Sequence, residues 1–221
     1  MPVKRVVPNP ITRCWSTGAT KDVSIGESGN PILVILQSPG ESEEDLRRPA
    51  TGHTGANLCR LFSFIGKGCK TQGDYCLRKI TIINSTCDDA QLPDLTEKVT
   101  VFCIGEKAVR WYRGHLKKLP AQHSAFSFCH LGSRGLRRIK SSTGSVLSER
   151  EILKMWAIYI RENTDNFERY EKLSFFSLQD YLVTYGYQWM NGDKHVGTPQ
   201  WATDSFISSK KPNRVDVMRK A

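Results

Sequence analysis

Four short apolar runs between residues 32 and 129 constrain the fold of this chain more than any other feature of its sequence. They are Ile32–Leu36, Lys79–Ile83, Val99–Ile104 and Ala125–Cys129. Each is rich in β-branched or aromatic residues, and each is nearly continuous. Such runs are typical of strands that helices cover on both faces of a parallel sheet. We therefore expect four parallel strands in this region.

Helical patterns lie between the apolar runs. Thr54 can cap the first helix, and Gly66 can end it. A second helical pattern covers residues 106–113. Four apolar residues of the first segment share one helical face: Leu58, Leu61, Phe62 and Ile65. Strands that alternate with helices predict an α/β fold, a three-layer α/β/α arrangement around a central four-stranded parallel sheet.

The sequence beyond residue 140 has a helical pattern. Ser148 and Glu151 have the spacing of a capping box ahead of an amphipathic segment, and Ser177 and Asp180 repeat that spacing. We therefore divide the chain into three regions: an irregular lead-in at residues 1–30, an α/β core at residues 31–140, and a helical C-terminal extension with a basic tail at residues 141–221.

The charge balance of the chain is strongly basic. It has 32 Lys and Arg residues against 22 Asp and Glu residues, a net charge of +10. This balance favours a polyanionic partner, nucleic acid before membrane, although a basic solvated surface is the simpler alternative. We find no membrane-spanning stretch and no signal peptide. We expect a monomeric, cytoplasmic protein.

The seven cysteines do not have the spacing of a zinc site. Their number is odd and no two form a C-x-x-C pair, which also makes a disulfide framework a poor interpretation. Cys103 and Cys129 lie inside apolar runs and are most simply small buried residues. This cysteine usage suits a reducing compartment.

Polar residues follow each apolar run, at the sheet edge where open parallel sheets bind ligands. The first run is followed by residues 37–41, the second by Asn84, the third by Gly105 and the fourth by His130. An asparagine amide can read the hydrogen-bonding edge of a base, and a histidine can stabilise a departing anion. Each residue alone has an ordinary alternative role, as a turn former or a structural histidine. Together, on one edge, they indicate a ligand site.

A basic loop follows His130. Its arginines and lysine can hold phosphates, or form a solvated face. An apolar residue of the loop, Leu131 or Leu136, can serve as a wedge in DNA or simply pack in the core. The residues that we predict to contact DNA are Ser133, Arg134, Leu136, Arg137, Arg138 and Lys140.

Residues 36–58, LQSPGESEEDLRRPATGHTGANL, resemble a motif of the uracil-DNA glycosylase superfamily, especially its thermophile-type iron–sulfur branch. In that branch a Gly-Glu-Ala-Pro-Gly-Glu loop precedes an acidic stretch, Arg-Pro-Phe-Val-Gly, a further glycine and a leucine. Shorter likenesses follow at Asn84, at residues 103–105 and at residues 130–133, so that the resemblance covers roughly residues 31–140. The first motif matches at Pro39, Gly40, Glu41, Glu43, Arg48, Pro49, Gly52, Gly55 and Leu58.

The resemblance implies an enzyme that flips a nucleotide out of DNA and hydrolyses its N-glycosidic bond, leaving an abasic site. His130 would then stabilise the departing base. An ordinary uracil-DNA glycosylase, a catalytically inactive DNA- or base-binding module, and an enzyme acting on a free nucleotide are the alternatives. The residues expected to contact the base are Gln37, Ser38, Pro39, Gly40, Ala50 and Asn84.

Ala50 departs from the family pattern in a way that bears on the substrate. The family has a phenylalanine here, which stacks on uracil, so Ala50 removes a stacking ring and leaves room. We expect a modified pyrimidine bulkier than uracil, such as hydroxymethylated or glucosylated cytosine, which would suit defence against viruses that modify their DNA. The alternative is that Phe62, Phe64 or Trp111 refills the wall.

Other departures concern catalysis and metal. The acidic positions of the family loop are Gln37 and Ser38 here, so the residue that activates water is a choice among Glu41, Glu43 and His53. Only Cys14 and Cys87 lie near cluster-ligand positions, and a cubane cluster needs four thiolates in most proteins. We therefore expect no metal and no cofactor, although unusual recruitment of Cys59, Cys69 and Cys76 is the alternative.

Overall fold

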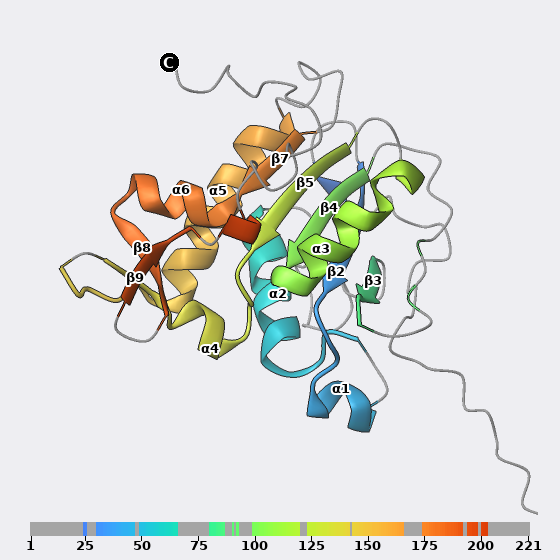
Figure 1. Ribbon diagram of the computed structural model, residues 1–221, viewed down its shortest axis with the longest axis horizontal. Helices are drawn as coiled ribbons and strands as arrows, with labels where there is room; N and C mark the ends of the chain where they lie inside the picture. Colours follow the sequence, from blue (N-terminus) through green and yellow to red (C-terminus); the bar gives the residue numbers. More distant parts are fainter. Residues whose placement is uncertain are drawn as a thin grey trace, which may run out of the picture.

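The structure is a computed structural model, shown in Figure 1. It describes residues 24–25, 30–46, 49–65, 80–86, 90, 92, 99–119, 123–141, 143–165, 174–191, 194–198 and 200–202. The remaining lead-in and the basic tail lie outside the described residues.

A sheet of five parallel strands forms the centre of the fold, in the order β3-β2-β4-β5-β7. Its strands are β2 (Asn30–Leu36), β3 (Thr81–Asn84), β4 (Val99–Ile104), β5 (His123–Phe128) and β7 (Ser174–Ser177). The antiparallel strand β1 (Ser24–Ile25), within the predicted lead-in, pairs with the start of β2. The four predicted strands are confirmed, but four was an undercount, because β7 joins the sheet at β5.

Helices pack on both faces of this sheet, as expected for an α/β fold. Alternate strand residues point to opposite faces, and Phe102 and Phe126 pack with one group of helices while Val101 and Ala125 pack with the other. The first group is α2 (Gly52–Ile65), α5 (Glu149–Asp165) and α6 (Leu178–Thr184). The second is α3 (Glu106–His115) with the short turns η4 (Leu116–Lys118) and η6 (Gln200–Ala202).

The region after residue 140 is not purely helical, so that prediction was wrong in part. Besides β7, it supplies two strands of a small antiparallel sheet, in which β6 (Ile139–Ser141) pairs with β8 (Tyr187–Asn191), and β8 with β9 (Lys194–Gly197). One hydrophobic core also runs across the expected 140/141 boundary, since Trp156 packs against Phe128 with ring centroids 5.4 Å apart.

The predicted helix caps are confirmed at two of three places, and α3 begins at residue 106 as expected. The Ser148 and Glu151 side chains accept from each other's backbone N–H groups, at 3.2 and 2.8 Å. The Ser177 hydroxyl accepts from the Asp180 N–H at 3.2 Å. Thr54 does not cap α2, because the helix begins two residues earlier, at Gly52. The described residues contain no helix long and apolar enough to cross a membrane.

Candidate active site

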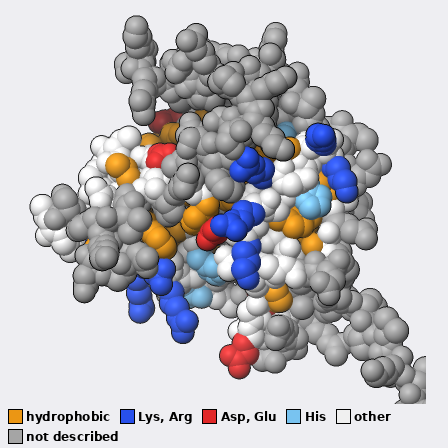
Figure 2. Space-filling view, in the orientation of Figure 1, with side chains coloured by type: hydrophobic (Ala, Val, Ile, Leu, Met, Phe, Trp, Pro, Cys, Tyr) orange, Lys and Arg blue, Asp and Glu red, His pale blue; other side chains and the backbone are white. Residues whose placement is uncertain are grey.

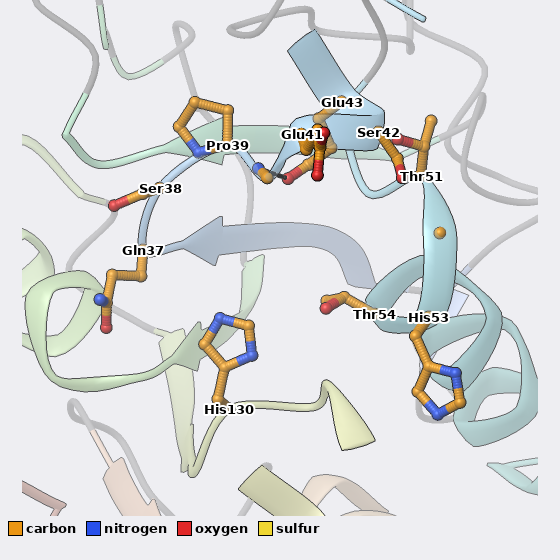
Figure 3. A pocket seen from close by; sticks show the side chains of 12 residues that line it. Gln37, Ser38, Pro39, Glu41, Ser42, Glu43, Thr51, His53, Thr54 and His130 are labelled. Carbon is orange, nitrogen blue, oxygen red and sulfur yellow. Dashed lines mark hydrogen bonds between the residues drawn. The ribbon is translucent and has the colours of Figure 1, made fainter. Parts of the chain in front are cut away.

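A cavity of about 340 Å³ opens beyond the carboxyl ends of β2 and β5 (Figure 3). Its size is at the lower end of the roughly 300–1,000 Å³ that small-molecule sites occupy. Four segments meet there: the loop after β2, the short helix α1 (Glu41–Leu46), the start of α2, and the loop after β5. Eight residues predicted from the sequence line the cavity: Gln37, Ser38, Pro39, Gly40, Glu41, Glu43, His53 and His130.

The loop after β2 is held by its neighbours on both sides. The Gln37 carbonyl accepts from the Thr86 N–H at 3.1 Å and from the Ser85 hydroxyl at 3.0 Å, which ties the loop to the end of β3. The Gln37 side chain lies against Gly105, where an added Cβ would come within 2.9 Å of the amide oxygen. The φ of 91° at Gly105 is what requires glycine there, since the flexible Gln37 side chain could move aside.

Glu43 fixes the geometry of the loop. Its carboxylate accepts from the Gly40 N–H at 2.7 Å through one oxygen and from the Ala50 N–H through the other. The residue is 7% exposed. Both oxygens are therefore used to connect the start of α1 to the turn before α2, and this geometry favours a positioning role for Glu43 over activation of water.

Glu41 is the exposed acid of the same loop. It is the first residue of α1 and lines the cavity. In Figure 3, Pro39 and Glu41 lie on one side of the cavity, and His130 projects from the other side into the space between Gln37 and Thr54. Of the two acids that line the cavity, Glu41 is thus the one whose carboxylate is available to a water molecule or substrate.

His130 is held in one tautomer by its own loop. The Gly132 N–H donates to His130 Nδ1 at 3.2 Å, so in the neutral ring the proton is on Nε2. Although part of the side chain is exposed, the surrounding protein desolvates the ring and lowers the pKa of His130. The result is a neutral Nε2–H donor that can stabilise negative charge developing in the cavity.

His53 belongs to a network that the sequence analysis missed. His53 Nε2 lies 2.8 Å from Glu149 Oε2, at the start of α5, and Asn57 Nδ2 donates to the same oxygen at 3.3 Å. Asn57 also donates to the Leu131 carbonyl at 2.8 Å, next to His130. Partial burial acts to raise the pKa of Glu149, but hydrogen bonds from His53 and Asn57, with the charges of His53 and Arg137, lower it overall.

No local signal in the sequence could have revealed this network. Glu149 lies 96 residues from His53, and Asn57 sits inside an ordinary amphipathic helix. The contact depends on how α5 packs on α2. In Figure 3 the His53 ring points away from the loop that carries Pro39 and Glu41, so its position at the edge of the cavity suits the network better than attack on a substrate.

Three residues predicted for the site are placed elsewhere. Ala50 is 2% exposed, packs in the core and does not line the cavity, so the prediction that it contacts the base was wrong. Its φ of 54° and its N–H bond to Glu43 give it a role in the turn before α2. Leu136 is 0% exposed, as is Leu131, and a fully buried side chain cannot contact DNA or serve as a wedge.

Asn84 lies at the expected strand end but is not one of the cavity-lining residues. It is the last residue of β3, opposite Leu36 of β2, and is fully buried. Its contact with the base remains a prediction.

The basic loop after His130 is exposed. Ser133 begins the short helix α4 (Ser133–Leu136), and Arg134, Arg137 and Arg138 lie on the surface, with Lys140 half-buried on β6. The Arg138 guanidinium lies 5.3 Å from the centre of the Trp189 ring on β8. Figure 2 shows Lys and Arg side chains near α4, close to histidine on the same face.

The described cysteines are buried thiols: Cys59, Cys103 and Cys129. Burial raises the pKa of Cys103 and brings that of Cys129 to about 12, so both thiols remain protonated. Among the residues that the structure describes, no group of three or more His, Cys, Asp or Glu side chains could hold a metal ion. Cys14, Cys69, Cys76 and Cys87 lie outside this part of the chain.

Comparisons of the chain with protein families, with curated proteins and with solved structures found no match.

Proposed function

We propose that this protein is a monofunctional DNA glycosylase that hydrolyses the N-glycosidic bond of a flipped, modified pyrimidine nucleotide. The observation that carries the proposal is the pairing of two groups across one cavity. His130 presents a neutral Nε2–H donor, and Glu41 supplies an exposed carboxylate on the opposite loop. The motif at residues 36–58 supports the same reaction class.

The two groups have complementary roles in the proposed reaction. As the bond between the sugar C1′ and the base nitrogen breaks, positive charge develops on the sugar and negative charge on the base. His130 stabilises the departing base through a hydrogen bond. The Glu41 carboxylate stabilises the cationic sugar and accepts a proton from the attacking water, whose oxygen bonds to C1′. The base anion takes a proton from solvent.

We further propose that the substrate is bulkier than uracil. Ala50 does not line the cavity and so gives this idea no support, but the residues of the cavity wall do. Phe62 is fully buried, and Trp111 stacks on His115 with ring centroids 3.9 Å apart, so neither ring refills the cavity. The wall instead carries hydroxyl groups that suit a hydroxymethyl or sugar substituent: Ser38, Ser42, Thr51 and Thr54. The Thr51 hydroxyl is buried without a hydrogen-bond partner among the described residues.

A catalytically inactive DNA- or base-binding module is the second candidate. The observation that favours it is the engagement of Glu43, whose two carboxylate oxygens are both bonded to backbone N–H groups. Glu41 is then the one exposed acid among the residues that line the cavity.

The test is abasic-site formation, detected as strand breaks after alkali, on duplexes with uracil, hydroxymethylcytosine or glucosylated hydroxymethylcytosine. Wild type should produce breaks, and His130→Ala should reduce the rate by about 10²–10³. His115→Ala is the matched control, because His115 stacks on Trp111 on α3 and does not line the cavity. Equal rates for the two variants would remove the role of His130.

A further inference from the structure

Acidic residues are missing from one continuous stretch of the chain. Residues 107–148 contain no Asp or Glu. They contain nine basic residues, which lie in two groups: Lys107, Arg110, Arg113, Lys117 and Lys118, then Arg134, Arg137, Arg138 and Lys140. Since the whole chain has a net charge of +10, nearly all of that excess is concentrated here.

The first group forms a stripe on the outer face of α3. Ala108, Val109 and Tyr112 are fully buried against the sheet. Lys107 and Arg110 are spaced three residues apart on the solvent side, where Arg110 also donates to Glu106 Oε1 at 2.5 Å, and the stripe continues through the exposed Lys117 on η4. The DNA contacts predicted from the sequence involve only the second group, so the stripe on α3 has no role assigned to it.

The two groups flank the cavity. α3 begins next to Gly105, which packs on the cavity-lining Gln37, while α4 begins three residues after His130. Figure 2 shows Lys and Arg side chains near α4 and over α3 on the same face, with histidine and an acidic side chain between them.

We infer that the exposed face of α3 and η4 is a second phosphate-binding track, so that DNA crosses the cavity and is held on both sides of the flipped nucleotide. The inference rests on the proposed function for the identity of the polyanion. Ten residues of α3 rise about 15 Å and three of η4 about 6 Å. With one phosphate per roughly 3.4 Å of a strand, the track spans about six nucleotides.

The apolar side of α3 argues for DNA over an anionic membrane surface. A helix that lies on a membrane inserts an exposed apolar face among the lipids. Here that face packs on the sheet, and Trp111 and Leu116 are themselves packed against the core. What α3 offers to a partner is charge at regular spacing, which suits a phosphate backbone.

The test compares two double variants that each remove one Arg and one Lys. Arg110→Gln with Lys117→Gln changes the track. Lys154→Gln with Arg161→Gln changes exposed positions of α5, on the opposite face of the sheet, and is the matched control. Binding to an undamaged duplex of about 20 base pairs is measured by fluorescence anisotropy over a range of salt concentrations, with thermal unfolding to verify the fold of each variant.

The track variant should lower the slope of log K against log salt by about 2, while the control keeps the wild-type slope. Base release at saturating DNA should be unchanged by the track variant. Base release therefore tests the glycosylase proposal, and the salt dependence of binding tests the track separately. A wild-type slope for the track variant, or an equal loss in the control, would overturn the inference. So would unchanged DNA binding combined with weakened binding to phosphatidylserine vesicles.

Discussion

Glu41 and Glu43 are two residues apart and are chemically identical, yet the fold gives them different environments. Glu41 is exposed at the start of α1, while Glu43 is buried with two backbone N–H groups on its carboxylate. The sequence alone could not show which of the two acids is buried, because the second donor to Glu43, the Ala50 N–H, is seven residues away across a turn. The same bond explains why Ala50 faces the core instead of the cavity.

We expect Glu43→Gln to destabilise the protein and Glu41→Gln to leave its stability unchanged. A glutamine amide presents an NH₂ group where Glu43 accepts a hydrogen bond, and a buried N–H left without an acceptor costs about 1–3 kcal/mol. Urea unfolding of the two variants measures the difference. Equal unfolding free energies would mean that Glu43 does not hold the loop.

Glu149 should make the stability of the protein depend on pH. Its pKa in the folded protein is lowered, so its contribution is complete above the pKa of an unfolded glutamate, about 4.3, and is lost as the pH falls through the folded-state value. The unfolding free energy of wild type should therefore exceed that of Glu149→Gln by more at about pH 6 than at about pH 3. A difference that stays constant or grows toward low pH would contradict the network with His53 and Asn57.

At the scale of the elements, two helical glycines differ in what an added side chain would contact. A Cβ at Gly135 in α4 would lie 1.9 Å from the His130 carbonyl oxygen, so α4 packs directly on the backbone that carries His130. A Cβ at Gly114 in α3 would meet nothing within 4 Å. The first glycine is required by close packing, and the second carries only the cost of a flexible residue in a helix.

Gly135→Ala should therefore destabilise the protein by at least about 2 kcal/mol and reduce base release, because the overlap with His130 must be relieved by moving its loop. Gly114→Ala should stabilise the protein by about 1 kcal/mol. Thermal unfolding of both variants is the measurement. A Gly135→Ala protein as stable as wild type would show that α4 does not approach His130 so closely.

At the scale of the whole molecule, the sequence predicted the centre of the sheet better than its edge. Four strands were predicted because their residues are apolar on both faces, and the carboxyl ends of β2 and β5 were correctly expected to meet. Strand β7 was missed because Ser174–Ser177 is short and runs directly into α6, and β8 because its aromatic residues follow a helix. Asn57 and Glu149 were missed because their contacts depend on tertiary packing alone.

The region after residue 148 should be required for folding, because it supplies part of the same core. Trp156 is fully buried, donates to the Leu178 carbonyl at 3.0 Å and packs on Phe128. A chain that ends at Ser148 would expose Phe126 and Phe128 to water, at a cost of about 1.5–3 kcal/mol for each ring. We expect it to lose the cooperative urea unfolding of the full chain. Cooperative unfolding of the shortened chain would make residues 149–221 a separate extension.

The central claim is that a base leaves DNA at the cavity between Glu41 and His130. Mass spectrometry of the small molecules released from duplexes with uracil, hydroxymethylcytosine or glucosylated hydroxymethylcytosine tests it most directly. We predict one free base for each abasic site, the bulky cytosines released faster than uracil, and loss of release in Glu41→Gln but not in Glu162→Gln, an exposed acid of α5. No free base from any of these duplexes, under conditions where the protein binds them, would contradict the claim.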